Sequence, residues 1–285
     1  MRHFLLSLCL IILCAVGVNT PVRAQSAVAA QTNSASVLRI APHRAIYTMA
    51  LASTKSGSNI TDVSGNLSFE WRDVCDGWTI QQHMKLHFTS GEGDDQDIVS
   101  NELTWEAKDG KRYNFNIHHQ TNGKDTEYYR GKAIQKADGS VFVSYNRPKG
   151  KTLLLPSGTL FPTAHTELVL RTATEGGKFF TSRVFDGSDE AGAGDISAFI
   201  SPPRSVDQET GLSPELMKNP LVSADSWPVH LAFFKIDGEK EQPDYEMDLS
   251  LLPNSIARYI KIDYGDFSMI GTLVGVESFT AQKCS

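Results

Sequence analysis

Cysteines are the residues of this sequence whose spacing most clearly predicts a covalent bond. Cys9 and Cys14 fall in an apolar N-terminal segment, whereas Cys75 and Cys284 stand 209 positions apart. In an oxidising compartment, an even pair of this kind favours one disulfide over two buried free thiols. Such a bridge would tie the last residues of the chain to an early segment.

The histidines could in principle bind a metal, but their spacing argues against a site. On one strand, His83 and His87 would share a face about 13 Å apart, which is too far for a single ion. The adjacent His118 and His119 would point to opposite faces. Neither cysteine nor carboxylate stands at zinc spacing from the other candidates, His43, His165 and His230. We therefore predict no metal ligand, and we expect His83 and His87 on a polar outer face.

Acidic side chains gather in residues 94–97 and 186–190. Neither segment has the alternating ligands, central glycine and distal glutamate of a calcium loop, so both are expected to be solvated loops. The chain has no Gly-x-Ser-x-Gly elbow and no glycine-rich phosphate loop. Ser157 lies in a Pro-Ser-Gly-Thr turn with no evident base beside it. We predict no catalytic residue, no cofactor and no enzymatic activity.

The N-terminus is typical of an export signal. Arg2 precedes an apolar run from Phe4 to Val18, and Val22-Arg23-Ala24 matches a cleavage site. We therefore predict a signal peptide over residues 1–24, with residues 28–30 as a second candidate site. An uncleaved anchor is disfavoured by the short run, and lipidation is disfavoured by the leucine before each early cysteine. The predicted location is the periplasm of a Gram-negative cell, with secretion as the alternative.

Composition restricts the partners of the chain. The sequence has 285 residues, 40% of them hydrophobic, and a formal charge of −6; removal of Arg2 and Arg23 with the signal takes this to −8. A mildly acidic chain argues against nucleic acid or an anionic membrane surface as the main partner. We predict a flexible lead-in over residues 25–41 and a single domain over residues 42–285, with no membrane span in the mature chain.

An alternation of period two dominates the sequence and predicts β-strands. Residues 63–72 and 78–89 each alternate apolar and polar side chains, and Asp76-Gly77 between them predicts a hairpin with Cys75 at its tip. Further turns at Asp109-Gly110, Asn122-Gly123 and Asp138-Gly139 predict a sequential antiparallel meander. Strands are also expected at 179–185, 196–200, 229–236, 245–251, 256–264 and 267–279.

One helix interrupts the strands after Phe161. Pro162 suits its first turn, Thr163 is the expected N-cap, and Gly176-Gly177 ends it. Ala164, Leu168 and Ala173 are expected to face inward, with Val169 and Leu170 beside them, and one more helical turn is expected at 214–218. Several late strands are apolar on both faces, which predicts either a sheet that coils over itself or a lined cavity.

Three segments resemble the EipB-like cell-envelope integrity family over about residues 42–285. They are Glu70–Trp78, Leu153–His165 and the terminal Cys284. The resemblance implies an all-β fold: an open, spiral-like antiparallel β barrel with one inner helix, similar in shape to periplasmic lipoprotein carriers. It also implies a periplasmic role in envelope integrity and a disulfide between Cys75 and Cys284. The family has no established catalytic residues and no settled ligand, so neither is carried over.

Two functions follow from this sequence. In the first, the curved sheet binds a lipid or lipoprotein acyl chain, with Trp78, Met84, Phe88 and Phe115 as wall residues and Leu160 and Phe161 as the lip. These six side chains could equally be ordinary core. In the second, the protein is a scaffold that docks a periplasmic protein partner through a sheet edge or its outer face.

Overall fold

The computed structural model describes residues 40–280 apart from 210 and 236–241, together with residues 282 and 284. The chain divides into two units, Met1–Val37 and Leu38–Ser285, and every described residue belongs to the second. The predicted signal peptide, and the predicted lead-in up to residue 39, lie outside the described residues.

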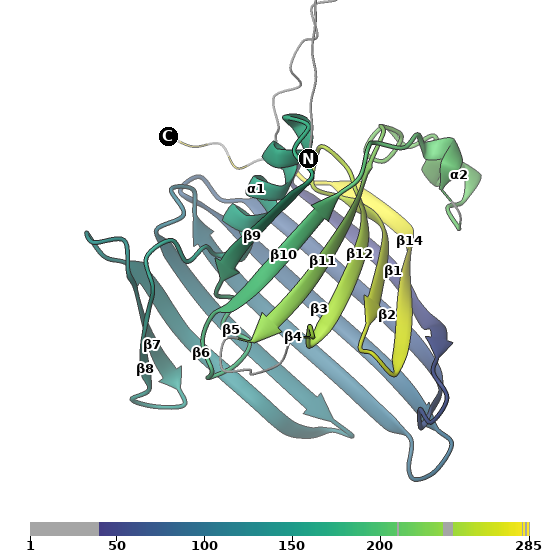
Figure 1. The fold of residues 1–285 in the computed structure, drawn as a ribbon, viewed down its shortest axis with the longest axis horizontal. Coiled ribbons are helices and arrows are strands. Elements are labelled where there is room, and N and C mark those ends of the chain that lie inside the picture. Colours follow the sequence, from purple (N-terminus) through teal and green to yellow (C-terminus); the bar gives the residue numbers. More distant parts are fainter. Residues whose placement is uncertain (1–39, 210, 236–241, 281, 283, 285) are drawn as a thin grey trace, which may run out of the picture. The chain divides into compact units, whose positions relative to one another are not determined.

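One antiparallel sheet of 14 strands contains most of the second unit (Figure 1). In chain order its strands are β1 (His43–Thr54), β2 (Ile60–Asp73), β3 (Gly77–Ser90), β4 (Gln96–Ala107), β5 (Arg112–Thr121), β6 (Lys124–Gln135), β7 (Val141–Arg147), β8 (Thr152–Leu155), β9 (Phe179–Val184), β10 (Gly194–Ile200), β11 (Trp227–Lys235), β12 (Tyr245–Leu251), β13 (Ala257–Asp263) and β14 (Phe267–Ser278). The sheet is open, as the resemblance to the EipB-like family implies.

The first and last strands of the chain are neighbours in the interior of the sheet. The order runs from β8 back to β1, then through β14 to β9, so that β1 pairs with β14 and the two edges are β8 and β9. Sequence alternation did not predict β1, although His43, Ala45, Tyr47 and Met49 of β1 are all buried. Pairing of the first strand with the last means that the sheet is complete only when the whole chain has folded.

The sheet curls so that its two edge regions approach each other. Leu160, just after β8, forms a parallel bridge with Val184 at the end of β9. Phe185, the next residue, packs against side chains of β5, with its ring 5.6 Å from that of Phe115. These contacts define an inner face, whose buried side chains include Tyr113 and Phe115 of β5 and Val141 and Val143 of β7.

Helix α1 (Pro162–Thr174) packs against this inner face at β9 and β10, where Val169, Leu170 and Ala173 join the cluster formed with Ile196 and Ala198. Two predictions for the helix are wrong in detail. Phe161, and not Thr163, occupies the N-cap position, and it provides no side-chain cap.

The buried stripe of α1 also differs from the predicted one. Thr163, His165, Val169, Leu170 and Ala173 are buried, whereas Ala164 and Leu168 are half-buried. A contact outside the hydrophobic pattern also orients the helix, because the backbone N–H groups of Thr163 and Ala164 in its first turn donate to Glu106 of β4. The second predicted helical turn is present as α2 (Pro214–Met217), where the Ser213 side chain accepts a hydrogen bond from the Leu216 N–H. A 3-10 turn, η1, precedes it (Val206–Gln208).

The helices of the described residues include none that is both long and apolar enough to cross a membrane.

Candidate functional site

The inner face of β3–β6 carries a band of polar side chains, which we call the polar band: Gln82, Ser100, Glu102, His119 and Glu127. The register brings them together, because Gln82 pairs with Glu102 and Ser100 pairs with His119, which in turn pairs with Glu127. The side chains then connect, with Ser100 Oγ 3.1 Å and Gln82 Nε2 3.4 Å from Glu102 Oε1. A sheet interior that is polar in this way is not a simple hydrophobic core.

His119 is the titratable centre of the polar band. Its Nδ1 lies 2.9 Å from Glu127 Oε2, and its Nε2 lies 3.7 Å from Glu102 Oε1. The nearby Glu102 carboxylate raises the pKa of His119, and the contact with Glu127 acts in the same direction. Two carboxylates therefore favour the protonated imidazolium on the inner wall.

The opposite inner wall is apolar. Side chains on the inner face of β11–β13 are only half-buried: Phe233, Tyr245, Met247, Leu249, Ile260 and Ile262. Phe233 stacks on Tyr245 with ring centroids 4.2 Å apart and an interplanar angle of 14°. Apolar side chains that stay partly accessible inside a curved sheet provide a surface that another apolar group could cover.

A cavity of about 380 Å³ lies between these two walls. His119 and Glu127 of the polar band line one side, and Ile196, Phe233 and Tyr245 line the other. Asp189 and Lys235 add opposite charges, with Lys235 Nζ 3.9 Å from Asp189 Oδ2. A smaller cavity of about 310 Å³ is lined by Ile40 and by Glu167, Leu170 and Arg171 of α1. The first cavity thus joins an apolar wall to a charged rim, which suits an amphipathic molecule.

A buried carboxylate fixes α1 across the interior. Glu106, at the end of β4, is 3% exposed and accepts hydrogen bonds from the backbone N–H groups of Thr163 at 2.7 Å and Ala164 at 2.9 Å. These are donors that a helix N-terminus leaves without an intrahelical partner. Burial raises the pKa of Glu106 to about 7, although both hydrogen bonds act in the opposite direction.

His165 lies one turn into the same helix and is also buried. Its ring packs edge-on to Phe180 at 5.9 Å, and its Nε2 has no hydrogen-bond partner among the described residues. Burial lowers the pKa of His165 to about 4. At this helix, burial therefore favours the neutral form of both groups: the protonated carboxyl of Glu106 and the unprotonated imidazole of His165.

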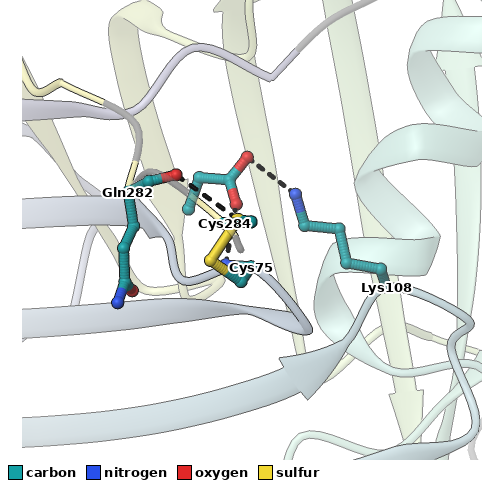
Figure 2. Close-up of a disulfide and its surroundings, with 5 residues drawn as sticks. Cys75, Lys108, Gln282 and Cys284 are labelled. Atoms are coloured by element: carbon teal, nitrogen blue, oxygen red, sulfur yellow. Dashed lines mark hydrogen bonds and ion pairs between the residues drawn. A yellow bond between two sulfur atoms is a disulfide. The ribbon is translucent and has the colours of Figure 1, made fainter.

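The disulfide predicted between Cys75 and Cys284 is present (Figure 2). Cys75 lies at the tip of the β2–β3 hairpin with a φ of 63°, and its backbone N–H donates to Asp73 Oδ1. Beside the bridge, the Lys108 ammonium lies 2.7 Å from Asp73 Oδ2 and 4.0 Å from the centre of the Trp78 ring. The bridge thus fixes Cys284 near the end of β4 that also bears Glu106.

The six predicted ligand residues lie in four separate clusters. Trp78 packs edge-on to Trp71, and Phe88 packs edge-on to Phe267. Phe115 and Phe161 each stack on Tyr113. Met84 and Leu160 are half-buried beside other parts of the core. The two cavities described above are lined by other residues. A ligand role for these six residues stays a prediction.

Other sequence predictions concern the charged groups. His83 and His87 are exposed, and they contact Asn101 and Asp97 on the outer face. Among the described residues, no group of three or more His, Cys, Asp or Glu side chains is arranged to hold a metal. The polar band and Glu106 were not predicted. A signal for them was present in β4, where Ser100, Glu102 and Glu106 share one phase of the strand.

Comparisons with known proteins agree with one another. A model of the EipB-like family matches residues 34–280. The chain is 30% identical over 262 residues to the cell envelope integrity protein EipB of Brucella abortus (strain 2308), with 90% of each chain covered. It also resembles the crystal structure of a beta-barrel-like protein of a domain of unknown function from Brucella abortus. That match has a TM-score of 0.78 and 28% identity, and it covers 85% of this chain and 99% of the other.

Proposed function

Because this chain belongs to the EipB-like family, we propose that it supports the integrity of the cell envelope as a periplasmic protein. The relative from Brucella abortus, which matches over 90% of this chain, is a cell envelope integrity protein. The export signal predicted over residues 1–24 agrees with this location. Intact-mass measurement of the exported protein should give a chain that begins at Gln25; a retained N-terminus would contradict the export proposal.

The molecular role that we propose is binding of a hydrophobic ligand, a lipid or an acyl chain, inside the curved sheet. One observation carries the proposal: apolar side chains of β10–β12, among them Ile196, Phe233 and Tyr245, face His119 and Glu127 of the polar band across a cavity of about 380 Å³. Known ligand sites are concave, mostly apolar and of roughly 300–1,000 Å³, with a few polar groups that orient the ligand. Apolar burial would drive binding, at about 0.8 kcal/mol for each methylene group covered.

The two walls give the ligand a direction. Phe233 and Tyr245 would contact the apolar chain, while His119, Glu127 and Lys235 lie where a polar headgroup would be placed. We propose that this binding is non-enzymatic. Ser100 donates its hydrogen bond to Glu102 and not to His119, so the polar band lacks the nucleophile–base contact that acyl transfer needs.

Titration with a fluorescent fatty acid tests this proposal. The wild type should bind the probe, and Phe233→Glu, which places a charge on the apolar side of the cavity, should weaken binding at least about tenfold, since a charge is costly in an apolar site. Val274→Glu is the matched control, because Val274 is 52% exposed on β14. Equal binding by both variants, or no uptake by the wild type, would contradict the proposal.

A second candidate function rests on the edge strand β9. Phe179 and Phe199 are 54% and 48% exposed, and their rings lie 4.7 Å apart beside this edge. An edge with exposed aromatic side chains suits a protein partner that adds a strand. Crosslinking from Phe179 in cells would recover such a partner. In this scaffold role, Phe233→Glu would leave envelope function intact.

A further inference from the structure

We propose that the outer face of β5–β8 binds the surface of an anionic lipid bilayer. The proposal is independent of a ligand in the interior, because the residues concerned point away from it. It departs from the expectation based on whole-chain charge. The net charge hides an uneven distribution of positive and negative residues along the chain. Residues 108–151 hold ten Lys and Arg against four Asp and Glu, a net charge of +6 in a chain whose total is −6.

The strand register collects these cations on one surface. On β5–β7 the outer positions alternate with buried inner ones such as Phe115, Ala133 and Val143. We call this surface the basic face, and define it by Arg112, Arg130, Lys132, Lys136 and Arg147. All five side chains are exposed, and none of them forms an ion pair within the part of the chain that the structure describes.

The pairing shows how the cations are spaced. Arg130 pairs with Arg147 across β6 and β7, and Lys132 follows two positions later on the same face of β6. Paired strands lie about 4.8 Å apart and same-face neighbours about 7 Å apart, so the charges are closely set. Two acids border the face, Asp125 beside His118 and Asp138 in the β6–β7 turn, and they leave an excess of positive charge.

A row of exposed apolar side chains crosses the same face. Ile134, Phe142 and Leu154 pair side by side on β6, β7 and β8, and they are 42%, 39% and 65% exposed. The Lys136 ammonium lies 5.4 Å from the centre of the Phe142 ring. The row ends on β8, an edge of the sheet (Figure 1).

Charge complementarity selects the occupant. Cations near an anionic bilayer each strengthen binding by about fivefold, and interspersed apolar side chains insert at the headgroup boundary. An acidic protein would satisfy the cations, but it would need a matching surface for three apolar side chains that stand in a line at a sheet edge. A bilayer needs no such match, so the combination favours a lipid surface.

Vesicle flotation tests the proposal with the mature chain. The wild type should float with vesicles of equal parts phosphatidylglycerol and phosphatidylcholine and not with pure phosphatidylcholine vesicles, and added salt should release it. Arg130→Glu with Lys132→Glu should weaken the partition coefficient at least about twentyfold. The control pair is Lys178→Glu with Lys218→Glu, two exposed lysines elsewhere that change the net charge equally.

The apolar row has its own variant. Phe142→Ser with Leu154→Ser should weaken flotation several-fold and leave its salt dependence unchanged, because the cations are still present. Thermal unfolding of each variant close to that of the wild type confirms that the fold is kept. The proposal is overturned if the wild type ignores anionic vesicles at low salt, or if the control pair loses binding as much as the test pair. It is also overturned if a protein captured by crosslinking from the basic face in cells binds the purified chain, and anionic vesicles do not compete with that binding.

Discussion

The Glu106 carboxylate, at the end of β4, lies 2.7 Å from the backbone nitrogen of Thr163 in the first turn of α1. The same carboxylate accepts from Ala164, so one buried side chain takes the place of an N-cap. Because α1 packs on β9 and β10, this contact connects strands that are far apart in the sheet order. The helix is thereby fixed between β4 and the strands β9 and β10.

Removal of this carboxylate should loosen the helix. Glu106→Ala leaves two buried helix N–H groups without an acceptor, and we expect unfolding free energy to fall by about 1–3 kcal/mol. Glu106→Gln keeps one acceptor oxygen and should cost less. Urea unfolding of the two variants measures the difference. Equal stability of Glu106→Ala and wild type would show that the contact does not hold the helix.

Glu106 should make stability fall as pH rises. Burial raises its pKa from 4.5 to about 7 in the folded protein. The folded state therefore binds the proton more tightly than the unfolded state. Its stabilising contribution is full below about pH 4.5 and is lost as pH rises to about 7, with a magnitude of about 3 kcal/mol. Glu106→Gln should lack this loss in urea unfolding series across that range.

His165 should act in the opposite direction. Its pKa falls from 6.5 to about 4, so its contribution is full above about pH 6.5 and is lost as pH falls to about 4. The two effects offset each other in the wild type. His165→Leu should become more stable relative to wild type as the medium is acidified. If Glu106→Gln and His165→Leu changed stability with the same pH slope, this account of the helix would be wrong.

The disulfide should stabilise the joint between the first and last strands. It closes a separation of 209 residues and follows β14, which pairs with β1. Chain entropy gives at most about 5 kcal/mol for a loop of this size. Cys75→Ser with Cys284→Ser should therefore lower the midpoint of urea unfolding clearly, to the same extent as reduction of the wild type. A midpoint unchanged by reduction would contradict a stabilising bridge.

Alternation in the sequence was sufficient to predict most of the strands and the hairpin that bears Cys75, because tight turns and period two are local signals. It did not predict the inner face of β4. There Leu103 is 47% exposed and Trp105 lies 5.2 Å beneath Arg112, while Ser100 and Glu106 point inward. Hydrophobicity alone would place the apolar residues of this strand inside, and the polar band reverses that choice.

The N-cap of α1 could not be found locally either. Thr163 has the right side chain for a cap, but its backbone N–H is held by a carboxylate 57 positions earlier in the chain. The six predicted ligand residues show the same difficulty. Four of them are apolar in a plausible strand phase and two precede the helix, yet the cavity forms where β5 and β6 face β10–β12. Contacts between distant strands decide such sites, and the sequence pattern of one strand does not contain them.

Native mass spectrometry of the protein purified from a Gram-negative envelope tests the central claim, a hydrophobic ligand in the curved sheet. The measurement compares the oxidised wild type with the Cys75→Ser, Cys284→Ser variant. The account predicts a copurified lipid or acyl species on the wild type, and less of it on the variant, since the bridge restrains the end of β4 near α1. A wild type that carries no ligand and acquires none from added fatty acid would contradict it.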